Sequence, residues 1–168
     1  MIVLETERLV VRHLRPDDLD AFFEICADAD VMRYVGDGGP LTRELTELWI
    51  ANSLANYQKH GFGTFALTLR GGDRVVGYAG LVRPTADGEA EIIYGIEKPL
   101  WGRGLMSEAA AALVELGFER FGLRRMIATI DPDNLPSITI AGKLGMKFEL
   151  ERRDEYGLPE LLYAVEAA

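Results

Sequence analysis

Residues 101–109 read Trp-Gly-Arg-Gly-Leu-Met-Ser-Glu-Ala, and this stretch decides how the rest of the chain is interpreted. It joins a strand predicted over residues 90–96 to a helix predicted to begin near Ser107. Glycines let the backbone come close to a ligand, and the free N–H groups at a helix start favour phosphate. The stretch lacks the Gly-Lys-Ser/Thr ending of a P-loop and the third glycine of a dinucleotide fingerprint. It therefore predicts either a pyrophosphate-binding turn of another kind or a tight turn without a ligand.

Strands are predicted on both sides of this turn. A period of two in the apolar residues over 64–69 and 74–82 predicts a β-hairpin, and residues 125–130 predict a further strand. A strand, a helix and a strand in succession imply that 90–96 and 125–130 are parallel neighbours. Shorter strands are predicted over residues 9–12, 147–153 and 161–165.

Helices are predicted wherever apolar residues recur at helical spacing. The first follows Pro16 and places Leu19, Phe22, Phe23 and Cys26 on one buried face. The second runs from an N-cap at Thr42 to His60-Gly61, with Leu45, Leu48, Trp49 and Asn52 on one stripe. Two more are predicted from about residue 107 to 121 and from Pro136 to Leu144. We therefore expect a single α/β domain over residues 1–168, with a mixed, mostly antiparallel sheet and about four helices.

Composition narrows the class of protein. The chain has 168 residues, and 18 Lys and Arg against 27 Asp and Glu give a formal net charge of -9. This sign disfavours binding to nucleic acid or to anionic membranes, and we expect neither as a partner. One cysteine forms no internal disulfide, and no apolar run approaches membrane-spanning length. The N-terminus lacks the pattern of a signal peptide. A cytoplasmic location is the expectation.

Three segments match one family in order and spacing. Residues 5–12 read Glu-Thr-Glu-Arg-Leu-Val-Val-Arg, and residues 101–109 match a Trp-Gly-x-Gly-Tyr-Ala-x-Glu-Ala pattern. A third pattern, Asn-x-x-Ser followed by Lys-x-Gly-Phe, is matched by Asn134, Ser137, Lys143 and Gly145, with Met146 in the last place. In these segments the chain resembles the GNAT superfamily of acyl-CoA-dependent N-acetyltransferases, particularly the ribosomal-protein-alanine acetyltransferase branch. The resemblance extends from about Glu5 to Val165.

The resemblance implies a GNAT-like sheet with a splayed parallel strand pair and acetyl-CoA as co-substrate. Splayed strands leave backbone groups unpaired, and an amide-bearing arm can bond to them as an added strand would. By analogy, Asn134 bonds to the pantetheine arm, and the strand edge near Ile96 and Glu97 pairs with its amides. The pyrophosphate is held by the backbone of Gly102, Arg103, Gly104, Leu105, Met106 and Ser107.

Two positions depart from the family pattern. Met106 stands where the branch has alanine, and its bulk narrows the pocket or shifts the arm. Some members use a tyrosine of the last short helix to protonate the leaving thiolate, and Ala141 occupies that position here. That role is therefore vacant in this chain.

Amine acetylation needs a deprotonated nitrogen, a stabilised oxyanion and a proton for the thiolate. Glu91, on the strand that leads into the glycine turn, is the first candidate for general base through water, with Glu89 and Glu97 as alternatives. Ser137 is the candidate proton donor; the alternative is a structural role in the first helical turn. A backbone N–H near Ile96 is the expected oxyanion donor.

A covalent route and a metal are both disfavoured by the sequence. Cys26 has no histidine nearby and is predicted to be buried, so direct transfer in a ternary complex is preferred to an acyl-cysteine. His13 and His60 are the only histidines and lie far apart in the sequence, so no metal is predicted.

The acceptor pocket is expected between the first two helices and the last hairpin, by analogy with the branch. Tyr34, Asp154 and Glu155 are its predicted lining, with carboxylates attracting an ammonium group. Tyr156 and Trp49 are further candidates, although Trp49 is also a natural core residue. A protein N-terminus and a small-molecule amine, such as a polyamine or an aminoglycoside, both fit.

The sequence therefore predicts an acetyl-CoA-dependent N-acetyltransferase that acts on a primary amine. The main alternative is a non-catalytic acyl-CoA-binding or regulatory module on the same fold, which the vacant tyrosine position favours. A different acyl donor and a purely structural interaction domain are further alternatives. The branch often forms dimers, so a homodimer stays open.

Overall fold

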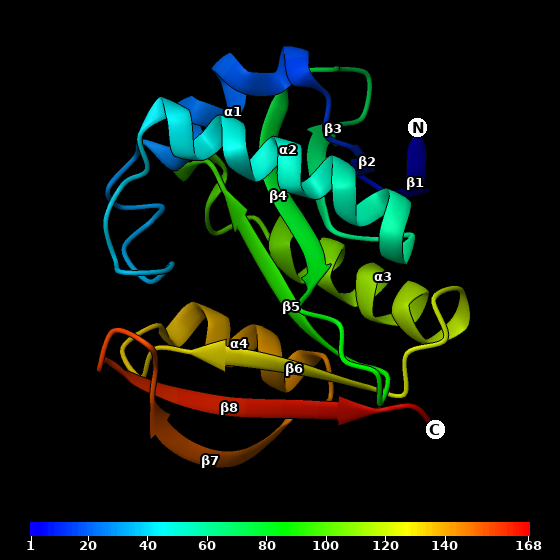
Figure 1. Cartoon of the computed structure of the whole chain (residues 1–168), viewed down its shortest axis with the longest axis vertical. Coiled ribbons are helices and arrows are strands. Elements are labelled where there is room, and N and C mark those ends of the chain that lie inside the picture. Colours follow the sequence, from blue (N-terminus) through cyan, green and yellow to red (C-terminus); the bar gives the residue numbers. More distant parts are fainter.

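The computed structural model describes residues 1–168, and an eight-stranded sheet runs through its centre (Figure 1). The strands are β1 (Ile2–Glu5), β2 (Leu9–His13), β3 (Thr64–Leu69), β4 (Val75–Val82), β5 (Glu89–Ile96), β6 (Arg125–Ile130), β7 (Lys147–Arg153) and β8 (Pro159–Glu166). They lie in the order β1-β2-β3-β4-β5-β6-β8-β7. Only β5 and β6 are parallel neighbours. The predicted mixed, mostly antiparallel sheet is confirmed.

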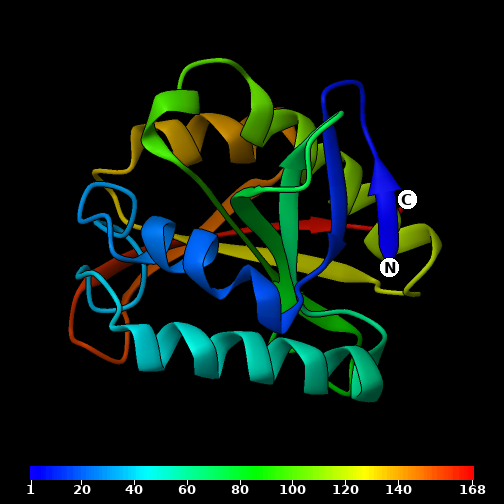
Figure 2. The ribbon, with the colours of Figure 1, turned by 90° about the horizontal axis from the view of Figure 1, so that it is seen from above.

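Four α-helices cover the two faces of the sheet. They are α1 (Leu19–Cys26), α2 (Arg43–His60), α3 (Leu105–Glu119) and α4 (Leu135–Lys143), and two 3-10 turns, η1 (Pro16–Asp18) and η2 (Lys98–Leu100), complete the elements. Figure 2 shows α1 and α2 on one face and α3 and α4 on the other. None of these helices combines the length and the apolar character needed to span a bilayer.

The structure corrects two expectations about the N-terminal half. Residues Ile2–Glu5 form an edge strand that the sequence analysis did not predict. The predicted apolar stripe of α2 is also wrong, because Leu45 and Leu48 are 49% and 53% exposed. The buried residues of α2 are Thr46, Ile50, Ser53 and Tyr57. Thr46 and Ser53 tolerate burial because their hydroxyls donate to the backbone carbonyls of Thr42 and Trp49.

The parallel pair β5–β6 is short, and this shortness positions the site. Its register covers Glu89 to Glu91 against Arg125 to Ile127, whereas β4 pairs with β5 as far as Ile96. Beyond Glu91 the two strands separate, and Figure 1 shows β5 rising steeply away from the nearly level β6. The expected splayed strand pair is thus present. Backbone groups of β5 from Ile92 onward that face β6 have no strand partner there.

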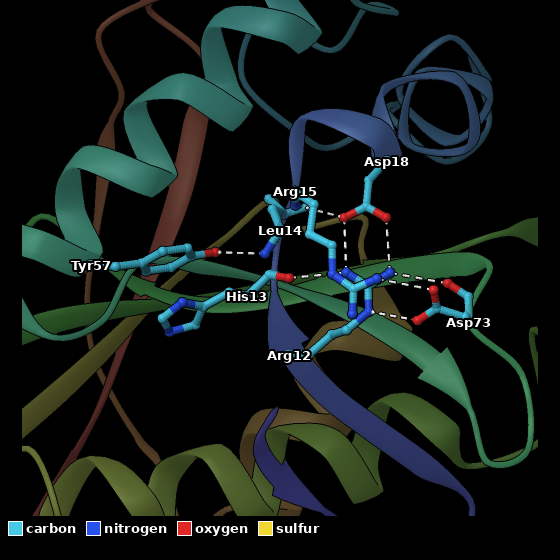
Figure 3. A network of polar contacts seen from close by, with 7 residues as sticks. All are labelled: Arg12, His13, Leu14, Arg15, Asp18, Tyr57 and Asp73. Carbon is cyan, nitrogen blue, oxygen red and sulfur yellow. Dashed lines mark hydrogen bonds and ion pairs between the residues drawn. The ribbon is translucent and has the colours of Figure 1, made fainter. Parts of the chain in front are cut away.

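A buried ion pair anchors β2 to the first helical turn of the chain (Figure 3). Arg12 is 2% exposed, and its two terminal nitrogens each donate to an oxygen of Asp18 at 2.8 Å. The guanidinium also donates to the carbonyl oxygens of His13 at 2.9 Å and Asp73 at 3.0 Å. Arg12 Nε lies 3.3 Å from the Asp73 carboxylate. Three segments of the N-terminal half therefore converge on one cation.

We expect Asp18→Asn to lower the free energy of unfolding by about 3 kcal/mol, because it leaves the buried Arg12 cation without its main counter-ion. Arg15→Gln is the matched control, since Arg15 pairs with Asp73 at the exposed surface. Its loss should cost less than about 1 kcal/mol. Urea unfolding of both variants measures this difference, and equal effects would contradict the assigned role of the buried pair.

Candidate active site

A cleft of about 940 Å³ opens where β5 and β6 separate. Its walls come from both halves of the molecule, including the loop between α1 and α2, the start of α4 and the hairpin between β7 and β8. Predicted site residues that line it include Tyr34, Glu91, Asn134, Ser137, Asp154 and Glu155. The fold thus brings the predicted catalytic and acceptor-side residues to one cavity.

The glycine turn forms the N-terminal end of α3. Gly104 has a φ of +75° and is the N-cap of the helix, which begins at Leu105 rather than near Ser107. None of the backbone N–H groups from Gly102 to Ser107 donates a hydrogen bond within the chain. Six successive free donors at a positive helix end form an arrangement suited to a pyrophosphate.

The strand edge predicted to hold the pantetheine arm is only partly free. The carbonyl oxygen of Ile96 accepts a hydrogen bond from the indole N–H of Trp101 at 2.8 Å. Glu97 is fully engaged elsewhere: its N–H bonds to Val76, its carbonyl accepts from Leu100, and its carboxylate pairs with Arg74. Glu97 therefore has no free backbone N–H with which to pair a pantetheine amide.

Asn134 and Ser137 lie together at the start of α4. Asn134 is the N-cap, and its side-chain oxygen accepts from the N–H of Ser137 at 3.4 Å. This cap occupies the Asn134 oxygen but leaves its amide nitrogen free of contacts within the chain. The Ser137 hydroxyl is not part of this cap, and Ser137 lines the cleft.

Tyr94 is a cleft residue that the sequence analysis missed. It lies on β5 beyond the last residue paired with β6, and it lines the cleft together with Ser137. Burial raises the pKa of Tyr94, and the Ser137 contact opposes that rise. Tyr94 is therefore a neutral phenol at physiological pH. The sequence signal that could have identified Tyr94 was its position on the predicted strand, two residues before Ile96.

Glu91 has one hydrogen-bond donor on β6 and one ion-pair partner just beyond the end of β4. Thr129 of β6 donates to one carboxylate oxygen at 2.5 Å, and Arg83 lies 3.5 Å from the other. Glu91 is 9% exposed. Arg83 has a φ of 51° and is the only non-glycine residue with positive φ. Neither Thr129 nor Arg83 was recognised from sequence, because each faces Glu91 only once the strands pair.

The other two candidate bases are already paired. Glu89 accepts from Arg125 at 2.8 Å, and Arg125 also bonds to Glu149. Glu97 lies outside the main cleft, in its pair with Arg74. Among the three acidic residues of this segment, Glu91 alone lines the cleft.

The residues predicted to bind the acceptor, Tyr34, Asp154 and Glu155, line the cleft from two loops. The Tyr34 hydroxyl lies 3.4 Å from the carbonyl oxygen of Asp133, so the loop between α1 and α2 meets the loop before α4. One oxygen of Asp154 accepts from the N–H groups of Tyr156 and Leu158 and shapes the β7–β8 turn. Glu155 makes no such turn contact. Trp49 lines the cleft, and its indole N–H donates to the Thr64 hydroxyl at 3.0 Å.

Cys26, the candidate for a covalent intermediate, and Ala141, at the position of the family's tyrosine, lie outside this cleft. Cys26 is fully buried in the smaller core with Phe22 and Tyr78. Ala141 is 1% exposed and packs in the larger core. No group of three or more His, Cys, Asp or Glu side chains has an arrangement that could hold a metal ion.

Comparisons with known proteins agree on one family. The family model described as "Acetyltransferase (GNAT) domain" matches residues 8–147. The uncharacterized N-acetyltransferase YnaD of Bacillus subtilis (strain 168) is 31% identical over 147 residues, which cover 87% of this chain and 83% of YnaD. The crystal structure of a GNAT-family acetyltransferase from Bacillus anthracis superimposes with a TM-score of 0.85 at 29% identity, covering 99% of this chain and 98% of that one.

A more distant structure shares the fold. RimL, a ribosomal L7/L12 alpha-N-protein acetyltransferase solved in complex with coenzyme A, superimposes with a TM-score of 0.86 at 16% identity. The alignment covers 99% of this chain and 98% of RimL.

We predict that Cys26 is unreactive in the native protein. Burial raises its pKa to about 12, and a hydrogen bond with Thr46 opposes this only in part. At pH 8 the thiolate fraction is then on the order of one in ten thousand. A chromogenic disulfide reagent should release no thiol from the native protein and one equivalent in denaturant. Rapid release from the folded protein would contradict the burial and reopen a covalent route.

Proposed function

The chain belongs to the GNAT family of acetyltransferases, and from this premise we propose that it transfers the acetyl group of acetyl-CoA directly to a primary amine within a ternary complex. One observation carries the proposal. The Glu91 carboxylate lines the cleft where β5 leaves β6, and the chain leads on from β5 to the six free N–H groups between Gly102 and Ser107 at the start of α3.

The residues present fit the coenzyme. The backbone from Gly102 to Ser107 would hold the pyrophosphate, since it offers unpaired donors at a helix N-terminus. The N–H of Ile96 and the side chain of Asn134 would hold the pantetheine arm. Leu105 and Met106 belong to the pyrophosphate turn by their backbone, and both side chains turn toward the larger core. When bound, acetyl-CoA supplies a thioester carbonyl that an amine can attack.

Glu91 is the proposed general base, acting through water. A free alkylamine has a pKa near ~10.4 and is mostly protonated at neutral pH, so a base must take its proton. Thr129 donates to one carboxylate oxygen and so orients the Glu91 side chain, and Arg83 lies 3.5 Å from the other oxygen.

Ser137 is the proposed proton donor to the departing thiolate. It lines the cleft beside Asn134, on the side of β5 that carries Tyr94. A backbone N–H near Ile96 would stabilise the oxyanion of the tetrahedral intermediate. As the C–S bond breaks, its electron pair would stay on sulfur and Ser137 would donate its proton to the thiolate. The proton that Glu91 takes from the amine would then return through water to Ser137, so that both side chains regain their starting state.

The acceptor is proposed to enter between Tyr34 and the β7–β8 hairpin, with Asp154 and Glu155 attracting its ammonium group. A protein N-terminus is one candidate, and RimL, which shares the fold, acts on a ribosomal protein. A small-molecule amine is the other. Ala141 at the usual tyrosine position favours the alternative of a non-catalytic coenzyme-binding module, which would bind acetyl-CoA without amine-dependent thiol release.

We predict micromolar-range binding of acetyl-CoA to the wild-type protein, measured by calorimetry. Gly104→Asp should abolish it, because a side chain at φ +75° strains the turn and its carboxylate repels the pyrophosphate. Gly122→Asp is the matched control, since Gly122 also has a positive φ, at +65°, and faces open space away from the cleft. Unchanged affinity in Gly104→Asp would remove this turn from the coenzyme site.

We predict that Ser137→Ala lowers turnover about tenfold or more, with little change in acetyl-CoA affinity, because it removes a proton donor and no coenzyme contact. Thiol release with a panel of amines measures turnover, and calorimetry measures affinity. Normal turnover would return Ser137 to a structural role.

For the base, we predict that Glu91→Gln lowers turnover about a hundredfold and that the loss is smaller at high pH, where free amine is abundant. Glu89→Gln is the control, because Glu89 lies on the same strand as Glu91 but is paired with Arg125 of β6. Equal losses in both variants would contradict the assignment of Glu91.

A further inference from the structure

Arg8, in the turn between β1 and β2, contacts the glycine turn before α3, which lies far from it in the sequence. Its Nε donates to one oxygen of Glu108 at 2.7 Å, and its backbone N–H donates to the other at 2.8 Å. Its Nη1 donates to the carbonyl oxygen of Arg103 at 2.7 Å, although 95 residues separate the two. One residue therefore holds both the turn and the first helical turn of α3.

The charge of Glu108 makes this contact matter for an anionic ligand. Glu108 lies in the first turn of α3, where a carboxylate favours the helix dipole but repels a phosphate at the adjacent N–H groups. Burial raises the pKa of Glu108, but hydrogen bonds from Thr6 and Arg8 outweigh burial and lower it overall. Glu108 is thus a carboxylate at neutral pH. The Arg8 guanidinium cancels its charge where an anion would bind.

Arg8 also has a donor to spare. Its Nη2 makes no hydrogen bond within the chain and lies 3.5 Å from the position of a Cβ on Gly104. The side chain is 45% exposed, so a ligand can reach it. Because Nη1 donates to the Arg103 carbonyl, the guanidinium offsets the partial negative charge of that oxygen.

Resting on the proposed function, we propose that Arg8 is a coenzyme-binding residue of this chain. It fixes the turn 102–107 in its open form, neutralises Glu108, and presents Nη2 to a phosphate oxygen of the coenzyme. The nearby Arg70 differs: it bonds to the carbonyl of Thr6 and lies near Glu5, and it contacts neither the turn nor Glu108.

Calorimetry with coenzyme A and with adenosine diphosphate tests this assignment on four variants and the wild type. Arg8→Met should weaken both ligands by about tenfold or more, because it removes a charge-assisted donor and exposes the Glu108 charge. The double variant Arg8→Met with Glu108→Gln should recover about half of that loss on the logarithmic scale, because the repulsion is gone. Arg8→Lys should fall between wild type and Arg8→Met. Arg70→Gln, which is comparably exposed, should bind as wild type does.

The outcomes separate the two proposals. If wild type binds no coenzyme A, the proposed function and the assignment of Arg8 that rests on it are both overturned. If wild type binds and Arg8→Met binds equally well, the assignment of Arg8 is overturned. A loss in Arg8→Met that the Glu108→Gln change leaves unrelieved, with a lowered melting temperature, is also contrary to it, because the role would then be structural. The affinity of wild type should fall more steeply with added salt than that of Arg8→Met.

Discussion

The separation of β5 from β6 after Glu91 is the constraint on which the rest of the structure depends. Backbone N–H and C=O groups that have no strand partner bond to water or to another group. The separated strands therefore offer hydrogen-bonding groups to which an amide-bearing ligand can bind. The same separation makes room for the cleft. The glycine turn follows β5 and the α4 cap follows β6, so both lie at the carboxyl ends of the parallel pair, where α/β sheets commonly bind ligands.

Two arginines of β2 and the turn before it brace this arrangement in different ways. Arg12 is buried and gathers Asp18 and Asp73, so its role is to hold the N-terminal half together. Arg8 is half exposed and reaches the glycine turn, so it connects that half to the proposed coenzyme site. Breaking the buried Arg12–Asp18 pair would lower the free energy of unfolding strongly. The Arg8–Glu108 pair instead changes the local charge at the start of α3.

Much of the fold and part of the site were predictable from sequence, because turn chemistry and periodicity are local. The glycine turn, the parallel pair and four helices follow from such signals. The buried face of α2 did not, because Thr46 and Ser53 satisfy their hydroxyls within the helix and so replace apolar residues. The engagement of Glu97 and the placing of Tyr94 beside Ser137 depend on strand register, which residue spacing alone does not specify.

One bound coenzyme would join the free glycine turn to the free edge of β5. Hydrogen–deuterium exchange with and without acetyl-CoA reports on the backbone amides of both segments in the unmodified protein. We expect acetyl-CoA to slow exchange both at residues 102–107 and at residues 92–96. Adenosine diphosphate should protect only the first segment. Protection by acetyl-CoA elsewhere in the chain, with both segments unchanged, would show that the coenzyme does not join them.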